Sequence, residues 1–389
     1  MISISQKEAR SLIISTQGYM APAGSKSLPE WVKHLGYVQL DAINRVERAH
    51  HHILWSRDHS YRSPNLNQAM SLPSPRIFEY WAHAAAYLPI DDFRFSLLRK
   101  KRLREQGHGW HKNVDKKIGQ EVLKRIEAEG PLANSHFSDL GEKAKRKGPW
   151  FDWSPVKIVI EQLFSQGDLM VVRREKFQKV YDLTSRVLPS SISTDEPSIR
   201  EYIYYLIDQA SRSHGLFRLS EVTHLKKADF KQKTHQVFNE LIEDNKFVNV
   251  RVKGLECSDI YASPKLLEGS CEVAIKVRIL SPFDNLVIHR KWLQDIFQFP
   301  YRLECYVPEN KRTWGYFALP VLWGHQFVGW LDCKANRKTK TLEIERWGLV
   351  EKVSKNSSFK KAFETELEQY AAFNGCESWV FLSKRPKLF

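Results

Sequence analysis

Long hydrophobic runs are missing from this sequence. The longest apolar stretches, such as residues 156–163, are interrupted by charge well short of the ~20 residues that a membrane-spanning helix needs. Residues 1–10 also lack the basic segment and the apolar core of ~7–15 residues that a secretory signal needs. We therefore expect a cytoplasmic protein that makes no contact with membranes.

Cysteine is scarce. The 389 residues include five cysteines, an odd number, and none of them forms a close pair with another. This spacing argues against a disulfide framework and against a zinc knuckle, and it predicts reduced thiols. The five are Cys257, Cys271, Cys305, Cys333 and Cys376.

Metal-binding patterns are also lacking. His50, His51 and His52 are consecutive, but adjacent helical positions point in different directions. Neither a cysteine nor an HExxH pattern lies nearby. A structural role is the favoured interpretation of the three histidines, and we expect neither a metal nor a cofactor.

Positive charge is present in excess. The chain has 60 Lys and Arg against 45 Asp and Glu, a net charge of +15, and its 42% hydrophobic content is typical of a chain folded into two to four domains. This charge favours a polyanionic partner such as nucleic acid. Residues 94–148 hold fifteen Lys or Arg against seven Asp or Glu. Their densest part, Arg99–Arg104, fits either a phosphate-contacting element or a solvated helix face.

Helix caps organise the first fifty residues. Ser5 with Glu8 predicts a helix that ends near Thr16, and Ser27 with Glu30 predicts a second helix that ends at Gly36. Residues 37–41 alternate as an extended segment does, and a helical pattern resumes over residues 44–55.

Two later regions read as winged helices. In the first, helices are predicted at 115–129, 138–145 and 154–166, the last opened by Ser154-Pro155, and strands 169–172 and 179–183 flank the connector 173–178. In the second, helices at 198–211, 220–225 and 230–244 precede strands 247–252 and 259–262. Winged helices also serve as protein-binding modules, but two of them on so basic a chain favour DNA.

The last third is rich in predicted strands. They cover residues 273–279, 301–307, 315–320, 326–333 and 341–347, and a final helix covers 357–373 before Gly375. A small antiparallel barrel or sandwich is expected there, so the fold class is α+β.

One short motif has catalytic potential. In an extended segment Gln39 and Asp41 project from one face about 7 Å apart, while Val38 and Leu40 enter the core on the other. A carboxylate can take a proton from water, and an amide can orient that water. The ordinary alternative is that Asp41 caps a helix starting at Asn44.

The sequence around this motif resembles that of a known family. Residues 36–51, GYVQLDAINRVERAHH, and 79–89, EYWAHAAAYLP, resemble the winged-helix DNA glycosylases that unhook interstrand crosslinks, the AlkZ-like family, in its YcaQ (AlkX) branch. The likeness continues through FDW at 151–153, LSPFD at 280–284, YRLECYVP at 301–308 and KRTWGY at 311–316.

The resemblance implies a fold, a catalytic pair and a partner. It implies tandem winged helices followed by a β-barrel, and so a division into residues 1–93, which hold a further winged-helix-like unit with the motif, 94–190, 191–268 and 269–389. It implies that Asp41 and Gln39 are catalytic and that the partner is double-stranded DNA with alkylated or crosslinked purines. Because the family's other branch has Gln where Asp41 stands, substrates are transferred only from YcaQ-like members.

The chemistry suits so small a catalytic group. An N7-alkylated guanine is already cationic and leaves without protonation, so positive charge develops on the deoxyribose. Asp41 would stabilise that charge and deprotonate water, and Gln39 would hold the water. The motif contains no lysine to form a Schiff base, so we expect excision without strand cleavage, by a monofunctional glycosylase.

Other residues are candidates for DNA contact. Trp81 and residues 84–86 are interpreted as helix packing, whereas Glu79 and His83 are placed at the pocket. The remaining candidates are Arg45, Arg48, His50 and His51 after the motif, of which a helix presents only part to DNA, and Arg173, Arg174 and Lys176 at the wing tip.

Two other classes of function stay open. A noncatalytic winged-helix transcriptional regulator would bind DNA in a sequence-specific way and would tolerate Asp41→Asn. A nuclease would need clustered Asp or Glu metal ligands, for which the sequence offers no convincing set.

Overall fold

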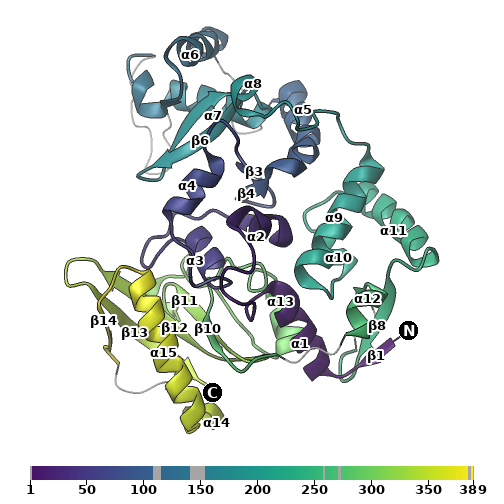
Figure 1. The fold of residues 1–389 in the computed structure, drawn as a ribbon, viewed down its shortest axis with the longest axis vertical. Coiled ribbons are helices and arrows are strands. Elements are labelled where there is room, and N and C mark those ends of the chain that lie inside the picture. The colour runs from purple at the N-terminus through teal and green to yellow at the C-terminus, as the bar shows by residue number, and fades with distance from the viewer. Residues whose placement is uncertain are drawn as a thin grey trace. The chain divides into compact units, whose positions relative to one another are not determined.

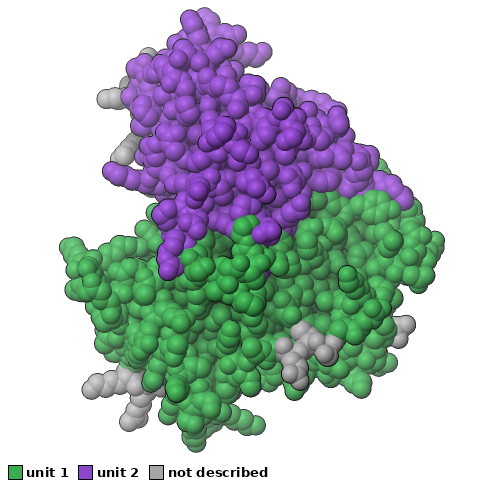
Figure 2. Space-filling model, viewed as in Figure 1, with its two compact units in different colours: residues 1–27, 34–61, 203–389 green, residues 28–33, 62–202 purple. Residues whose placement is uncertain are grey.

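The computed structural model describes residues 2–107, 115–140, 154–256, 259–269, 273–383 and 387–388. The chain divides into two compact units (Figure 2). Unit 1 comprises residues 1–27, 34–61 and 203–389, and unit 2 comprises residues 28–33 and 62–202. Among the described residues, no helix is long and apolar enough to cross a membrane. The FDW block at 151–153, Cys257 and Cys271 lie outside the described residues.

Unit 2 contains short helices and two small β-structures. A hairpin, β3–β4, precedes helix α5, and the sheet β5–β7–β6 is flanked by α6 and α7 (Figure 1). The elements are α4 (Pro64–Met70), β3 (Ile77–Trp81), β4 (Ala85–Pro89), the 3-10 helix η1 (Ile90–Ser96), α5 (Leu97–Gln106), α6 (Lys116–Glu129), β5 (Leu132–Ala133), η2 (Asn134–Phe137), α7 (Pro155–Gln166), β6 (Leu169–Glu175), β7 (Gln178–Leu183) and α8 (Thr184–Val187).

Unit 1 combines N-terminal segments with the C-terminal part of the chain. The parallel pairing of β1 with β8 places residues 2–4 beside residues 250–252. The elements up to β9 are β1 (Ile2–Ile4), α1 (Gln6–Gln17), α2 (Leu28–Leu35), whose residues 28–33 belong to unit 2, β2 (Val38–Gln39), α3 (Ala49–Trp55), α9 (Ile199–His214), which begins in unit 2, α10 (Leu219–Val222), α11 (Ala228–Glu243), β8 (Val248–Val252) and β9 (Tyr261–Ala262).

A curled sheet forms the C-terminal part of unit 1. Its strand order is β10-β11-β12-β13-β14, with β15 also paired to β13, and α15 packs against it (Figure 1). The elements are α12 (Pro264–Glu268), β10 (Val277–Ile279), α13 (Arg290–Phe297), η3 (Glu309–Lys311), β11 (Ala318–Trp323), β12 (Gln326–Asn336), β13 (Thr341–Leu349), α14 (Glu351–Ser354), α15 (Ser357–Phe373), β14 (Ser378–Phe381) and β15 (Lys387–Leu388). The core of this region includes Trp292, Phe299, Leu322 and Trp330.

Several predictions are confirmed. The Ser5–Glu8 capping box opens α1, the Ser154 hydroxyl caps α7 with Pro155 in its first turn, and α15 covers the predicted residues 357–373. Helices α9, α10 and α11 followed by β8 and β9 reproduce the order of elements predicted for residues 198–262. The α+β class is confirmed, but the C-terminal sheet is not wholly antiparallel, because β14 and β15 pair with β13 in parallel.

The predicted starts of two helices are wrong. Helix α3 starts at Ala49 and not near residue 44, because the Arg45 carbonyl accepts from the Ala335 N–H at 2.7 Å and the Glu47 N–H donates to Asn374 at 2.6 Å. These tertiary bonds use backbone groups that a helix would need. In the predicted helix at 138–145, residues 138–140 form a turn after η2, and residues 141–145 lie outside the described part of the chain.

Residues 77–89 form a hairpin and not the packed helix expected at Trp81 and 84–86. The register pairs Glu79 with Tyr87 and Tyr80 with Ala86. The β-ladder, together with the burial of Phe78, Tyr80 and Tyr87, here outweighs the helix propensity of the alanines.

The connector at 173–178 is shorter than predicted. Strand β6 runs on through Glu175, and only Lys176 and Phe177 join it to β7, both with positive φ. Arg173 and Arg174 are therefore strand residues.

Candidate active site

The segment that holds Gln39 and Asp41 is fixed by a buried asparagine. Asn285, which has no exposed surface, donates to the carbonyls of Tyr37 at 3.1 Å and Leu35 at 3.4 Å. Gly36 is the residue that lets the chain pass, because it has φ 78° and a Cβ there would lie 2.2 Å from Gln209. Strand β2 thus leaves α2 in one defined direction.

The side chains of residues 38–41 differ in burial. Val38 and Leu40 are buried, as predicted, and Gln39 is buried as well, whereas Asp41 is half-buried. The Asp41 Oδ1 atom accepts the Ile43 N–H at 2.7 Å, closing a turn. Because α3 begins only at Ala49, Asp41 does not cap a helix at residue 44.

The Asp41 carboxylate has few polar partners for a half-buried acid. In the described part of the chain the Ile43 N–H is its one hydrogen-bond donor, and no Lys, Arg or His forms an ion pair with it. Burial raises the pKa of Asp41, and the Ile43 hydrogen bond opposes that rise. A desolvated carboxylate of this kind is a stronger proton acceptor than one in water, provided that it is ionised.

A loop of residues 304–316 lies beside Asp41. It was predicted as a strand at 301–307, but there is none, because the buried Glu304 carboxylate binds backbone N–H groups of the same loop. Glu304 accepts from Thr313 at 2.8 Å, Trp314 at 2.7 Å and Gly315 at 3.3 Å. The loop thus satisfies part of its backbone internally instead of through a β-ladder.

Two residues of this loop lie within electrostatic reach of Asp41. The pKa of the Cys305 thiol is raised by burial and then by the Asp41 carboxylate. The pKa of the Tyr306 phenol is raised by partial desolvation, by Cys305 and by Asp41. Cys305, Tyr306 and Asp41 therefore form one neighbourhood, all of it in unit 1.

A buried ion pair anchors the helix that follows the motif. The Arg57 guanidinium, one residue beyond the C-cap of α3, binds the Asp284 carboxylate through both its terminal nitrogens, and both side chains have no exposed surface. The Tyr19 hydroxyl donates to the same carboxylate at 2.5 Å. Since Asn285 is the next residue, the turn at 281–285 fixes both strand β2 and helix α3.

Arg45 and Arg48 follow the motif outside any helix. Arg45 pairs with Glu345 at 2.5 Å, and its guanidinium lies over the Tyr316 ring, 5.5 Å from the centroid. Arg48 is half-buried at the N-cap position of α3.

His50 and His51 begin helix α3. His50 is buried against the His51 ring, with centroids 4.3 Å apart. The His51 Nδ1 atom is 2.6 Å from the Tyr61 hydroxyl, and burial lowers the pKa of His51 to about 4. Among the described residues no group of three or more His, Cys, Asp or Glu could hold a metal ion.

The other predicted site residues lie in unit 2. Glu79 is buried and takes two hydrogen bonds from Arg174, whereas His83 is exposed at the tip of the β3–β4 hairpin. Arg173 pairs with Glu175 at 2.8 Å, and Lys176 is exposed at the β6–β7 turn. Arg45, Arg48, His50 and His51 thus belong to unit 1, as Asp41 does. In unit 2 the structure joins Glu79 to Arg174.

Sequence reasoning missed the residues that shape the site. Glu304, Tyr306 and Asn285 were not singled out, although two of them lie in the family-like block at 301–308 and the third follows the block at 280–284. Their partners are more than 200 residues away or are backbone groups, so their spacing carries no local signal.

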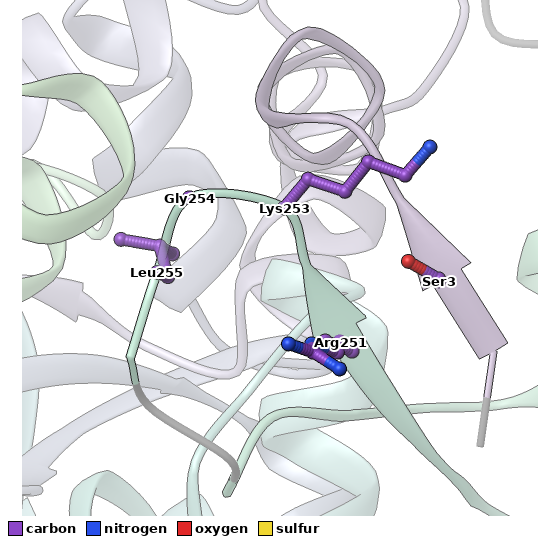
Figure 3. Close-up of a pocket in the computed structure, with 5 residues that line it drawn as sticks. All are labelled: Ser3, Arg251, Lys253, Gly254 and Leu255. Carbon is purple, nitrogen blue, oxygen red and sulfur yellow. The ribbon is translucent and has the colours of Figure 1, made fainter.

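A surface hollow of about 530 Å³ lies elsewhere in unit 1. Figure 3 shows Arg251 on β8 beside Ser3 on the adjacent β1, with Lys253, Gly254 and Leu255 completing the lining. None of the predicted site residues lines it, so this hollow is separate from the Asp41 neighbourhood.

Comparisons with known proteins give one consistent result. Residues 32–373 match the family model of the AlkZ-like DNA glycosylases. The solved structure of DNA glycosylase AlkZ from Streptomyces sahachiroi is similar over 100% of both chains, with a TM-score of 0.63 and 14% sequence identity, which establishes a likeness of fold. From the match over residues 32–373, the chain belongs to the AlkZ-like DNA glycosylase family.

Proposed function

We propose that this protein hydrolyses the N-glycosidic bond of N7-alkylated purines in double-stranded DNA, including purines crosslinked between strands. The observation that supports this most is the Asp41 carboxylate, which is half-buried and held by a single backbone N–H. A carboxylate in that state retains lone pairs for a water molecule and for a cationic sugar.

The proposed step uses the cationic substrate as its own leaving group. The C1′–N9 bond breaks, its electron pair stays with the alkylpurine, which leaves neutral, and positive charge moves to the deoxyribose. Water adds to C1′ while Asp41 takes its proton. Gln39, two residues before Asp41, orients the water by donating and accepting at once. The products are a free alkylpurine and an abasic site.

The strand stays intact in this proposal. The Gln39–Asp41 motif contains no amine to attack C1′, so no Schiff base forms and no elimination follows. We also propose that DNA is bound by the winged-helix units predicted from the sequence. The exposed or half-exposed candidates for contact are Arg48, His83, Arg173 and Lys176, whereas the burial of His50 and the pairing of Arg174 with Glu79 favour structural roles.

Two duplexes test the proposal, one with N7-methylguanine and one with a nitrogen-mustard crosslink. The wild-type protein should release the alkylpurine and unhook the crosslink, leaving abasic sites that break only after alkali. Asp41→Asn should bind both duplexes and leave them intact. Folded wild-type protein that leaves both duplexes unchanged would contradict the proposal, and activity equal to wild type in Asp41→Asn would contradict the role of Asp41.

A further inference from the structure

Tyr306 is the most exposed large hydrophobic side chain in the described structure. Its side chain is 85% exposed, although it follows Cys305 in the loop beside Asp41. A tyrosine ring left in water forgoes the stabilisation that burial would give it. An exposed ring beside a candidate active site therefore suits contact with a ligand.

The loop that presents Tyr306 is held in one conformation. The Glu304 carboxylate binds the N–H groups of Thr313, Trp314 and Gly315 on the far side of the loop. The Asp332 carboxylate binds the N–H groups of Tyr316 at 2.7 Å and Phe317 at 3.1 Å. Both carboxylates are buried. Tyr306 is thus displayed from a backbone that does not need to be ordered on binding, which lowers the entropic cost of a contact.

A second tyrosine of the same loop shows the contrast. Arg45 lies over the Tyr316 ring at 5.5 Å from its centroid and Arg312 at 5.0 Å. Those two protein cations already use the π system of Tyr316. Tyr306 has the same ring chemistry and is open to solvent, so its π system is available to a cation from outside.

Asp41 adds a negative charge near the exposed ring of Tyr306. Its carboxylate raises the pKa of Tyr306 along with the larger effects of partial desolvation and of Cys305, so the phenol stays neutral at physiological pH. A neutral aromatic face near an anionic carboxylate attracts a flat cation. In duplex DNA, an N7-alkylated purine is such a cation, whereas an undamaged purine is not.

We propose that Tyr306 stacks on the alkylated purine and selects the cationic base over its neutral counterpart. This inference rests on the proposed function, since it gives Tyr306 the substrate of that reaction. The base loses its charge as the glycosidic bond breaks, so the cation–π attraction is stronger in the bound substrate than in the transition state. Tyr306 therefore contributes to affinity for the lesion and not to the rate constant of bond cleavage.

Binding to two uncleavable duplexes tests the inference. One contains 2′-fluoro-N7-methylguanine, which is cationic and resists hydrolysis, and the other contains 7-methyl-7-deazaguanine, which has nearly the same shape but is neutral. Wild-type protein should bind the cationic duplex about tenfold more tightly than the neutral one, the size expected of a cation–π contact. Tyr306→Ala should lose most of this preference and keep only the part that the Asp41 carboxylate supplies, and Tyr306→Phe, which keeps the ring, should retain most of the preference.

Ile275→Ala is the matched control, because Ile275 is 74% exposed in the same unit. It should keep the wild-type ratio within about twofold, as surface substitutions usually do. A Tyr306→Ala protein that keeps the wild-type preference would overturn the inference. Because no excision is needed for this measurement, a wild-type protein that cannot release N7-methylguanine would refute the proposed function separately.

Discussion

Two acids in the family-like stretches of this chain differ in what surrounds them. Glu79, on β3 of unit 2, is buried and meets Arg174 twice, at 2.7 Å and 2.8 Å, with Lys179 at 3.8 Å. Asp41, after β2 of unit 1, is half-buried and takes one backbone N–H. Both carboxylates are partly or fully removed from water, but only Glu79 is compensated by cations.

This difference separates an acid with a structural role from the acid that we propose is reactive. A carboxylate that binds two cations has its lone pairs occupied and its position fixed, so it holds β3 to β6. A carboxylate without a cation keeps lone pairs for substrate and water, and burial raises its pKa, as it does for Asp41. The partner of an acid, more than its place in a motif, therefore decides its role.

The largest expected effect is the loss of excision in Asp41→Asn. Asparagine keeps a carbonyl oxygen that can accept the Ile43 N–H, so the turn should persist, but it cannot take a proton from water. We expect single-turnover release of N7-methylguanine to slow by about 100- to 10,000-fold, the usual contribution of a general base. The melting temperature, read by circular dichroism, should stay close to that of the wild type.

The pH dependence of excision sharpens this prediction. The folded pKa of Asp41 is raised, so its carboxylate is protonated at a higher pH than an exposed aspartate. The rate constant of excision should be at its maximum above that pKa and should fall as the pH drops through it. The same fall in Asp41→Asn, at its lower rate, would assign the titration to another group.

Glu79→Ala should reverse the pattern and harm the fold. It leaves Arg174, whose side chain is 12% exposed, without its carboxylate. We expect the free energy of unfolding, measured in urea, to fall by about 3 kcal/mol. This value is at the lower end of the range for a broken buried ion pair, because Arg174 keeps some contact with water. Asp91→Ala breaks the exposed Lys33–Asp91 pair in the same unit and should cost less than about 1 kcal/mol. Equal costs in the two variants would contradict the comparison.

A buried cation without a carboxylate extends the comparison. Lys100 on α5 is buried, with its Nζ 3.6 Å from the centroid of Phe93 and 4.8 Å from that of Tyr80. Within the described residues no carboxylate pairs with it, and burial lowers the pKa of Lys100 from 10.5 to about 7. Arg174 is also largely removed from water, but unlike Lys100 it forms an ion pair with a carboxylate, that of Glu79.

Lys100 should therefore make stability depend on pH. Between pH 7 and 10.5 the unfolded chain holds the Lys100 proton and the folded chain does not, so stability rises with pH, by at most about 1.4 kcal/mol per pH unit. Lys100→Met should lose this slope while keeping the packing. Urea unfolding at pH 7, 8 and 9 measures both slopes, and parallel slopes would show that Lys100 stays charged in the fold.

Local signals predicted those helices of this chain that begin with a clear cap, because caps are local. Ser5 with Glu8 and Ser154 with Pro155 define helix starts within four residues, and both are observed. Strand β1 was not predicted, because its partner β8 lies some 250 residues away and three residues of sequence hold no pairing information. The parallel strands β14 and β15, of four and two residues, were also missed, because segments this short hold no pairing information.

The candidate site was predictable only in part. The resemblance pointed to Gln39 and Asp41, and part of the predicted extended segment is observed as strand β2, which holds Gln39 and ends two residues before Asp41. Its surroundings were not predictable, because the Glu304 carboxylate accepts from backbone N–H groups nine and ten residues away and so makes a loop of an apparent strand. The Arg99–Arg104 run shows the limit of charge counting. In it Lys101 pairs with Glu196, Arg104 pairs with Asp168, and Lys100 is buried.

The smallest expected effect concerns an exposed cation of unit 2. Lys176 sits with φ 45° in the two-residue turn between β6 and β7, so Lys176→Asn removes the charge with a residue that tolerates this conformation. If Lys176 contacts a phosphate, the slope of log Kd against log salt should fall by about 0.9 for duplex DNA, with a modest loss of affinity. Arg104→Gln removes a cation that already pairs with Asp168 and should change the slope less. Because a solvated turn would release no counterion, an unchanged slope in Lys176→Asn would remove this residue from the DNA interface and leave Asp41 chemistry untouched.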